Sequence, residues 1–469
     1  MKILLIQPYA NESNTNYPPM GLLYLASYIR EKSTHAVKII DLRVNKTPIK
    51  NRLSTIKMWE PDIIGLTGMS IEWTGFKEVL HTIKPDMGKK IIFVAGGPHA
   101  TIFNTLVLEK TPVEYVIKGE GEETFLELIN ALDRHSDIRK IKGLSYRNRH
   151  HQIIETPDRE PIKEINRIPF PAYDLVPMED YFVNPHFHGN LNKYRRILPI
   201  ITSRGCPFHC SFCFHMFGNK FRPRSAENIL EEIDWLVHKY RIREFQIEDD
   251  IFNFHLPRAK KIMRKVIGRG YNLAISFPNG IRADLIDEEL MALFKEAGVY
   301  RIHFGIETAV PRIQKIASKP INMNKLKKAI ELTFQAGISS HGFFMIGFPT
   351  ETETEIKKTI RYAKTSKLAT ANFSIVKTYP GTPIGDAYLD DSKKSFDDDF
   401  SFSSDSTTTN YSRVPDARLK QLQRMAMISF YFRPGRIWQI FKTSPNKRNL
   451  FFRNIFSTLD IIIRGKTKY

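Results

Sequence analysis

The sequence predicts an α/β protein in which a doubly wound parallel sheet precedes a partial (β/α)6 barrel and a helical C-terminal region. Two stretches of the chain alternate short aliphatic runs with segments of helical length, one ending near residue 142 and the other spanning 196–384. Such runs are typical of strands buried on both faces, and their alternation with helices indicates parallel sheets. All three cysteines follow the first strand of the second stretch, where a barrel places its chemistry.

Residues 1–142 form the first predicted domain. Successive strand–helix units of this size build an open, Rossmann-like sheet, which binds ligands beyond the carboxyl ends of its strands. The expected strands are 2–7, 37–42, 62–67, 90–95 and 115–118, and the expected helices are 20–32, 49–59, 73–84 and 122–131.

The loops after these strands form a candidate ligand-binding edge. They are rich in glycine, which lets a backbone approach a large flat ligand closely. Each loop taken alone is a common and weak signal. The candidate residues are Gln7, Gly68, Ser70, Gly96, Gly97, Pro98, His99, Gly119, Glu120 and Gly121.

Residues 143–195 are expected to connect the two domains. Segments 143–147 and 152–155 have the pattern of a small hairpin. Prolines recur between 157 and 177 and favour an extended path over regular structure.

The second domain, 196–384, is predicted to be a six-stranded barrel open on one side. Catalytic groups of such barrels lie on loops at the carboxyl ends of the strands. A capping box begins its last helix at Thr352, and glycines stand where helix C-caps belong. The expected strands are 198–203, 244–248, 274–277, 301–305, 341–346 and 372–377, and the expected helices are 226–239, 257–267, 288–297, 324–335 and 353–365.

Cys206, Cys210 and Cys213 are the only cysteines, and they fall within eight positions. An odd number of thiols cannot close into disulfides, but three thiolates on one loop can hold a metal centre and leave one position open. Structural zinc is the simpler alternative, with His209 or His215 as the fourth ligand. Clustered free thiols and an N-terminus without a signal sequence indicate the cytoplasm.

The C-terminal part divides into an acidic polar loop, 385–410, and a basic region, 411–469. The basic region holds thirteen Lys or Arg against two Asp, a surplus of +11 within a net charge of +20. Its aromatic residues are interleaved with the basic ones, as in amphipathic helices. The pattern indicates contact with an anionic surface, such as peripheral binding to a membrane. The alternative is a solvated cap that closes the barrel.

The order of these modules resembles the cobalamin-binding group of radical S-adenosylmethionine (SAM) enzymes. The resemblance rests on the CxxxCxxC loop with Phe212 before its last cysteine, preceded by a sheet that carries Gly96-Gly97-Pro98-His99. Further matches are Ile247–Asp250, Asn279–Arg282, Gly305–Thr308, Phe344–Pro349 and Tyr379–Pro383. This group includes carbon methyltransferases and the anaerobic cyclase of magnesium protoporphyrin.

The resemblance implies a role for each matching residue. Cys206, Cys210 and Cys213 would ligate a [4Fe–4S] cluster, and the ten loop residues of the first domain would hold cobalamin. No histidine stands in the DxHxxG context of a cobalt ligand, so His99 is expected at the corrin edge or phosphate. SAM would contact Glu248, Asp249, Asp250, Arg282, Glu307, Ile346 and Gly347.

The implied activity is methylation of an unactivated carbon through a 5′-deoxyadenosyl radical and methylcobalamin. The alternatives are an oxidative cyclase or rearrangement enzyme without methyl transfer, or, in another class, an iron–sulfur redox or nucleic-acid-binding protein. The resemblance implies a small-molecule or hydrophobic substrate and a reductant such as ferredoxin or flavodoxin. The sequence identifies neither the substrate nor the residues that contact it.

Overall fold

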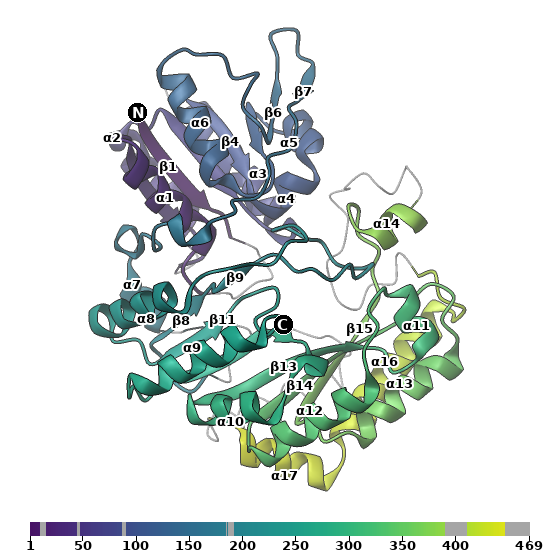
Figure 1. Ribbon diagram of the computed structural model, residues 1–469. Coiled ribbons are helices and arrows are strands. Elements are labelled where there is room, and N and C mark those ends of the chain that lie inside the picture. The colour runs from purple at the N-terminus through teal and green to yellow at the C-terminus, as the bar shows by residue number, and fades with distance from the viewer. Residues whose placement is uncertain are drawn as a thin grey trace. The chain divides into compact units, whose positions relative to one another are not determined.

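The computed structural model describes residues 1–9, 16–44, 47–86, 91–183, 185, 192–389 and 410–445. Contacts divide the chain into two compact units. The first holds Met1–Phe187 with Met216–Gly218, and the second holds the greater part of the remaining chain. Figure 1 shows the course of the chain through both units.

The first unit contains a seven-stranded sheet in the order β2-β1-β3-β4-β5-β6-β7. The five strands predicted for this domain are present and parallel, so the doubly wound sheet is confirmed. The strands are β1 (Lys2–Gln7), β2 (Ala36–Asp41), β3 (Ile63–Thr67), β4 (Ile92–Gly96), β5 (Tyr115–Ile117), β6 (Leu144–Arg147) and β7 (Ile153–Glu155).

The predicted hairpin is β6 and β7, and it extends this sheet. It pairs antiparallel with β5, which places it in the first unit although it lies in the segment expected as a connector. Two hydrophobic cores pack against the two faces of the sheet. The helices are α1 (Met20–Lys32), α2 (Leu53–Trp59), α3 (Trp73–Ile83), α4 (Gly97–Ile102), α5 (Asn104–Lys110), α6 (Gly121–Asp133) and α7 (Met178–Val183).

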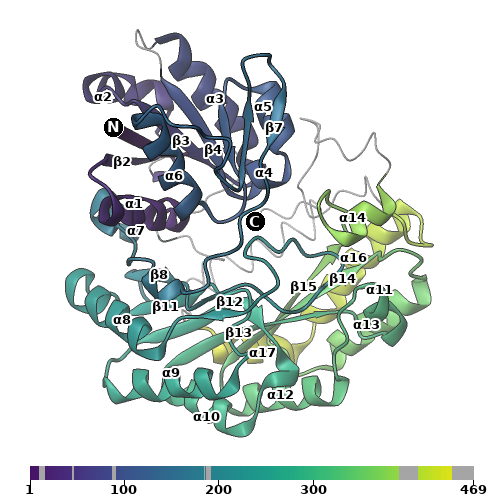
Figure 2. The same ribbon diagram turned by 45° about the horizontal axis from the view of Figure 1, so that its top comes forward.

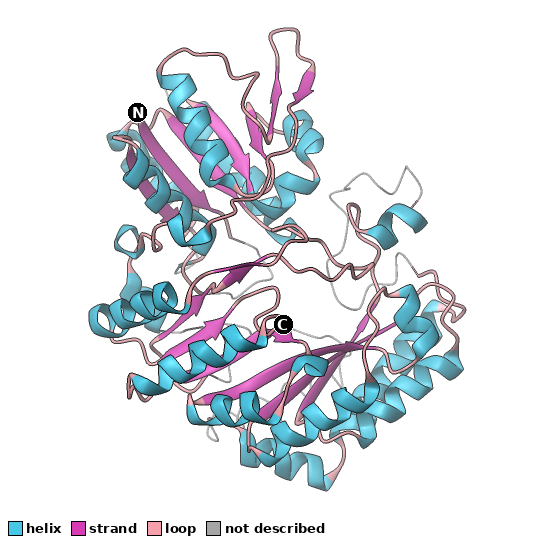
Figure 3. Cartoon of the chain, viewed as in Figure 1, coloured by secondary structure: helices cyan, strands magenta, loops and turns pink. Residues whose placement is uncertain are grey.

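The second unit contains the predicted partial barrel. Its six strands are parallel and lie in chain order, and the helices run along the outside of the curved sheet (Figure 2). The strands, magenta in Figure 3, are β8 (Ile197–Ile200), β11 (Glu244–Ile247), β12 (Ala274–Ile281), β13 (Val299–Glu307), β14 (Ser339–Ile346) and β15 (Thr370–Ile375). The predicted helices are α8 (Ala226–Tyr240), α9 (Leu256–Gly268), α10 (Glu288–Glu296), α12 (Met323–Gln335) and α13 (Glu353–Thr365).

Short elements of this unit escaped prediction. A two-residue pairing joins β9 (Ser203–Arg204) to β10 (Arg222–Pro223) across the cysteine loop. The helices α11 (Pro311–Ile316) and α14 (Pro383–Tyr388) span six residues each and begin at proline. Proline suits the first turn of a helix, but a segment of six residues is too short to show helical periodicity.

The basic region begins with α16 (Asp416–Tyr431) and α17 (Pro434–Thr443). Helix α16 packs on β15 and α13, burying Leu419, Leu422 and Phe430. The Tyr431 hydroxyl bonds both the N–H and the carbonyl of Ala371, so α16 covers the open edge of the barrel. Most of the predicted acidic loop, and residues 446–469, lie outside the described residues. None of the described helices combines the length and apolarity needed to cross a membrane.

Candidate cofactor site in the barrel

A cavity of about 400 Å³ lies among the carboxyl ends of the barrel strands. It brings together most of the predicted cluster and SAM residues of this unit. Cys206, Cys210, Cys213, Asp250, Arg282 and Glu307 all line it. Asn279, from the matching motif Asn279–Arg282, also lines it, as do Phe208, Lys319, Phe343, Asn372 and Ser374, to which the sequence analysis assigned no role.

The cysteine loop is fixed to its surroundings through Ser211. Its backbone N–H donates to the carbonyl of Ala317 at 2.9 Å, its hydroxyl donates to that of Ile316 at 2.9 Å, and its carbonyl accepts from Ile384 at 2.8 Å. Phe212 packs edge-on against the buried Phe348, with ring centroids 6.1 Å apart. The residues between the second and third thiols therefore anchor the loop.

Burial raises the pKa of all three thiols, and that of Cys213 to about 12. Binding a metal centre converts such thiols to thiolates, because the ion's charge outweighs the desolvation. The positive charge of Lys319 acts in the same direction on each of them. The three thiols are thus uncharged in the free protein and become thiolates when they hold a cationic centre.

The three acidic residues after β11 have different surroundings. Asp250 lines the cavity and accepts the Gly205 N–H at 2.9 Å. Asp249 is 2% exposed and accepts from the backbone and hydroxyl of Thr202 and from the hydroxyl of Ser203, at 2.5–2.6 Å. Its carboxylate is therefore engaged by the segment that follows β8, and Asp249 does not line the cavity. Glu248 does not line the cavity, although its carbonyl accepts from the cavity residue Asn279 at 3.0 Å.

Arg282 reaches the cavity from the end of β12. Its Nε and Nη2 donate to Asp284 at 2.8 and 2.7 Å, and its guanidinium lies 4.0 Å from the centre of the Phe208 ring. Its Nη1 is buried without a hydrogen-bond partner in the described part of the chain. One N–H group of a well-oriented cation is thus left for a ligand.

Glu307 forms a buried ion pair with Lys319 at 2.7 Å, and both residues line the cavity. Burial lowers the pKa of Lys319, but the charge and hydrogen bond of Glu307, together with the charge of Cys210, outweigh burial, and the net pKa is raised. Glu307 has φ of +60°, a strained value for a residue other than glycine. Such strain is retained where a side chain must be aimed at one place.

Ile346 and Gly347 turn away from the cavity. Ile346 lies in a core with Leu419 and Leu422 of α16. Gly347 has φ of +88°, and a Cβ atom there would lie 2.8 Å from a Leu419 methyl group. These two positions therefore serve the docking of α16 and do not line the cavity, and their contact with adenine stays a prediction. Phe343, Asn372 and Ser374 occupy that side of the cavity instead.

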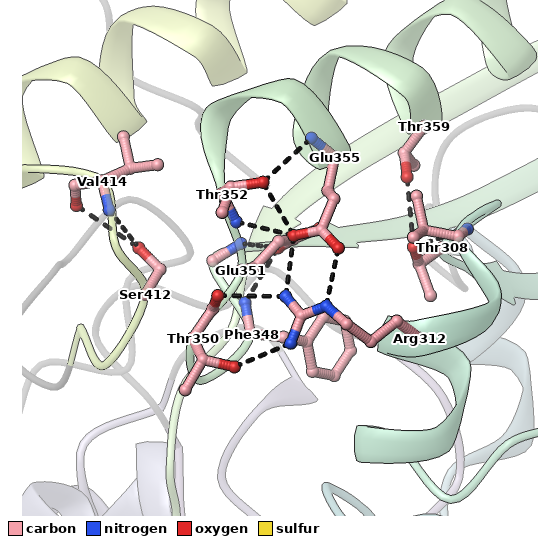
Figure 4. A network of polar contacts seen from close by, with 12 residues as sticks. Thr308, Arg312, Phe348, Thr350, Glu351, Thr352, Glu355, Thr359, Ser412 and Val414 are labelled. Atoms are coloured by element: carbon pink, nitrogen blue, oxygen red, sulfur yellow. Dashed lines mark hydrogen bonds and ion pairs between the residues drawn. The ribbon is translucent and has the colours of Figure 1, made fainter.

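Glu351 stabilises the turn that follows Gly347 (Figure 4). Its carboxylate accepts the N–H groups of Gly347 and Phe348 at 2.7 and 3.0 Å, and burial raises its pKa to about 7. Nearby, Arg312 grips Glu355 with two bonds of 2.7 Å and also reaches Thr350. This network holds Phe348, which is the packing partner of Phe212.

The predicted residues of the first unit gather at the carboxyl edge of its sheet but are largely paired with one another. Gln7 donates to Glu72 at 2.9 Å, and Ser70 bonds His99 Nδ1 at 2.9 Å. His99 is 3% exposed between Trp73 and Phe103, and burial lowers its pKa to about 4. His99 is therefore an uncharged core residue, which corrects the expectation of an accessible loop side chain.

Among the glycines of this edge, Gly119 is the one with open space beside its backbone. Gly119 has φ of +71° and no atom within 4 Å of a hypothetical Cβ, so its surface is open. Gly97 also has positive φ, and a Cβ there would strike the Thr67 hydroxyl at 2.2 Å. Gly68 follows directly after β3. Gly96 is the N-cap of α4 and Pro98 lies in its first turn, while Glu120 is the N-cap of α6 and Gly121 its first residue.

The surroundings of the cysteine loop do not form a closed zinc site with His215. His215 donates Nε2 to the Phe208 carbonyl at 2.7 Å, which removes that nitrogen from the thiols. Within the described ranges, no three Cys, His, Asp or Glu side chains converge closely enough to share one ion. An iron–sulfur cluster takes its thiolates on separate irons, so its ligands need not converge.

Comparison with known proteins agrees with this division of the chain. Residues 200–363 match the family model of the radical SAM superfamily, and residues 6–129 match that of the B12 binding domain. An uncharacterized methyltransferase of Pyrococcus horikoshii is 33% identical over 92% of this chain and 93% of its own length. The anaerobic magnesium-protoporphyrin IX monomethyl ester cyclase of Rubrivivax gelatinosus is 27% identical, covering 81% and 68% of the two chains.

A solved structure shows the same fold. The radical SAM methyltransferase TsrM of Kitasatospora setae superposes with a TM-score of 0.69 at 19% identity, over 82% of this chain and 75% of that one. The chain therefore belongs to the radical SAM enzymes that carry a B12-binding domain. The expected fold class, enzyme class and cofactors ([4Fe–4S] cluster, SAM and cobalamin) are confirmed.

The residues present fit these groups. Three thiols and a free guanidinium N–H face one cavity, as a cluster and the carboxylate of SAM require. The glycine edge of the first unit offers open backbone to a flat ligand. Lys319 was missed because it lies twelve residues beyond Glu307, outside the motif that drew attention to the latter. The signal that could have indicated it is a lysine that follows the short helix α11, itself preceded by the strand-end residue Glu307.

Proposed function

We propose that this enzyme methylates an unactivated carbon of a small molecule. The observation that carries the proposal is the convergence of three thiols, a guanidinium and a buried Glu–Lys pair on one cavity. When bound, the cluster, SAM and cobalamin supply the electron, the radical chemistry and the transferable methyl group. The chain's own contribution is to hold these groups in place and to keep water from them.

The assignment of roles follows charge. Cys206, Cys210 and Cys213 bind the cluster. The carboxylates of Asp250 and Glu307 suit the ammonium of SAM, and the cations of Arg282 and Lys319 suit its carboxylate. Phe343 and Asn372 face the remaining, less polar part of the ligand. Opposite charges on the cavity walls thus orient a zwitterion in a single way.

Cobalamin binding is assigned to the glycine edge of the first unit. Gly68, Gly96, Gly97, Gly119 and Gly121 contribute shape, Gln7, Ser70, Pro98 and Glu120 complete the edge, and His99 supports it from the core. His99 is held by Ser70 in the protein core, which supports binding without a protein nitrogen on cobalt.

Product analysis after anaerobic reconstitution tests the proposal. The reconstituted protein should hold about four irons and four sulfides. With SAM carrying a deuterated methyl group, extracts of a deletion strain should yield a product that gains the labelled methyl. A product with a new ring or oxidation and no label would instead favour the cyclase alternative, which the similarity to the Rubrivivax enzyme supports.

A small-molecule substrate and a one-electron reductant such as ferredoxin or flavodoxin complete the proposed scheme. Peripheral contact with anionic lipid is the finer proposal for the basic region. It is supported by α17, where Ile437 and Trp438 are 59% and 66% exposed, next to the positive charge of the region.

Vesicle flotation distinguishes this contact from a purely structural tail. Phosphatidylcholine vesicles containing phosphatidylglycerol should carry the protein upward at low salt and release it at high salt. Trp438→Ser should weaken flotation, whereas Met58→Ser, at an even more exposed apolar side chain of the first unit, should not. Full-length protein that stays in the soluble fraction at low salt would leave the tail as a structural cap.

A further inference from the structure

The interior of the barrel is unexpectedly polar below the cofactor cavity. Barrel interiors are normally filled by layers of Val, Ile and Leu. Here the register pairs Gln246 with Ser276, Ser276 with Arg301, and His303 with His341. Gly305 and Glu307 line the cavity from the same strand, so Arg301 and His303, at alternate positions, face the same interior.

Arg301 is the central feature of this polar layer. It is 6% exposed, and neither its Nε nor its Nη2 has a hydrogen-bond partner among the described residues. Glu244 attracts it electrostatically, but the oxygens of Glu244 already accept from Lys193, Tyr194 and Tyr300. The guanidinium of Arg301 also lies over the Tyr300 ring, 5.6 Å from its centre. Two buried N–H-bearing atoms of a cation without a hydrogen-bond acceptor are still costly, and a bound ligand is one way in which such a cost is removed.

The unpartnered atoms form the edge with which arginine holds a carboxylate. Elsewhere in this chain the same edge, Nε with Nη2, is occupied: Arg43 holds Asp41, Arg282 holds Asp284, Arg312 holds Glu355 and Arg418 holds Glu353. In all four pairs the acceptor is a carboxylate of the chain itself. Arg301 presents the same two donors with no such acceptor, which is the geometry for a planar anion.

The neighbours of Arg301 are suited to such a ligand. Burial and the charge of Arg301 lower the pKa of His341 to about 4, although a hydrogen bond with Asn372 acts in the opposite direction, so its ring is uncharged at neutral pH. Its Nδ1 is within 2.8 Å of the Thr370 hydroxyl. The rings of His303 and His341 lie 5.2 and 4.9 Å from Phe343, which also lines the cavity. The polar layer is therefore continuous with the wall of the cofactor cavity.

We propose that the barrel interior is a second binding site, specific for a carboxylate or phosphate group that Arg301 holds through Nε and Nη2. This site is separate from the cofactor cavity, which is lined by two other cations, Arg282 and Lys319. That the anion belongs to the enzyme's substrate is a corollary that rests on the proposed function. The binding site itself does not, and it is tested without turnover.

The first test is thermal unfolding of the full-length protein in buffer without multivalent anions. Arg301→Met removes a buried charge whose Nε and Nη2 make no hydrogen bond within the described residues, so the midpoint should rise, on the order of 2 °C. Arg224→Met is the matched control, because Arg224 is also 6% exposed but pairs with Glu232 and the Ile201 carbonyl. The control should lower the midpoint.

The second test adds inorganic phosphate or acetate against chloride at equal ionic strength. A ligand of the native state raises the midpoint by mass action, so wild type should be stabilised and Arg301→Met should not. Arg301→Lys keeps the charge without the fork and should also lose the shift, which protects the test against a misfolded Met variant. Stabilisation by phosphate alone identifies a phosphoryl ligand, and by acetate alone a carboxylate.

The proposal is overturned if Arg301→Met lowers the midpoint as Arg224→Met does and both anions shift wild type and variant equally. A cysteine variant that cannot hold the cluster should keep the anion shift. Failure of the proposed catalytic function would therefore leave this result in place, and the two ideas can fail separately.

Discussion

The barrel and the N-terminal sheet both end their parallel strands in loops that serve cofactors, but the two edges are built differently. At the barrel edge, the thiols, Arg282 and the Glu307–Lys319 pair are directed at one cavity. At the edge of the first sheet, the polar side chains satisfy each other, as Gln7 does with Glu72 and Ser70 with His99. What remains open there is the backbone at Gly119.

The difference indicates two ways of holding a cofactor. The barrel holds small charged groups, which need side chains of the opposite charge or thiolates at fixed positions. The first sheet holds a large cofactor by surface and shape, for which backbone and small residues suffice. Single substitutions should accordingly have large effects at the barrel edge and small ones at the sheet edge.

The largest effect is expected at the cysteines. Cys213→Ala should remove a ligand that nothing nearby replaces, so cluster content and SAM cleavage should be lost. His209→Ala, an exposed position in the same loop, is the control and should retain both. Iron and sulfide analysis with chromatography of 5′-deoxyadenosine measures the outcome. SAM cleavage retained by any single cysteine variant would contradict the assignment.

The sequence was sufficient for this part of the site because cysteine spacing is specific chemistry. It also located every strand of the barrel, since a buried parallel strand shows itself as an aliphatic run. It did not show which face a strand-end residue takes. Asp249 and Gly347 both lie in matching motifs, yet one is saturated by Thr202 and the other packs against Leu419. Such orientations depend on contacts between segments distant in sequence.

The second effect in size is expected at Lys319. Lys319→Met leaves the buried Glu307 unpaired, which should destabilise the protein by about 3–5 kcal/mol and weaken SAM binding at least about tenfold. Denaturant unfolding and isothermal calorimetry measure the two quantities. Adding Glu307→Gln should restore much of the stability without restoring SAM affinity. Wild-type affinity in the single variant would show that the pair is structural only.

Glu351 gives a smaller, pH-dependent effect. Burial raises its pKa from 4.5 to about 7 in the folded state, with a minor increase from Glu355 and a decrease from Arg312. Between these values the folded state keeps a proton that the unfolded state has lost. The free energy of unfolding should therefore fall, by about 3 kcal/mol in all, as the pH rises from 4.5 through 7.

Glu351→Gln should flatten this slope, because the amide oxygen can still accept from Gly347 and Phe348 while nothing titrates. Glu355→Gln is the control: the pKa of Glu355 is about 2, so the slope between 4.5 and 7 should persist. Denaturant unfolding at half-unit pH steps measures both. An unchanged slope in Glu351→Gln would assign the titration to another group.

The smallest effect on cofactor chemistry is expected at His99, and it tests the contrast between the two edges most directly. The side chain is buried, uncharged and hydrogen-bonded to Ser70, so we expect that it does not coordinate cobalt. Electron paramagnetic resonance of the cob(II)alamin form should then show no nitrogen superhyperfine splitting from the protein, in wild type or in His99→Ala. The substitution should still cost about 1–3 kcal/mol of stability, since it opens space beside Trp73 and leaves the Ser70 hydroxyl without its partner. Splitting that is present in wild type and vanishes in the variant would mean that His99 leaves the core to bind cobalt. The first sheet would then use side-chain chemistry as the barrel does, and the distinction between the two edges would fail.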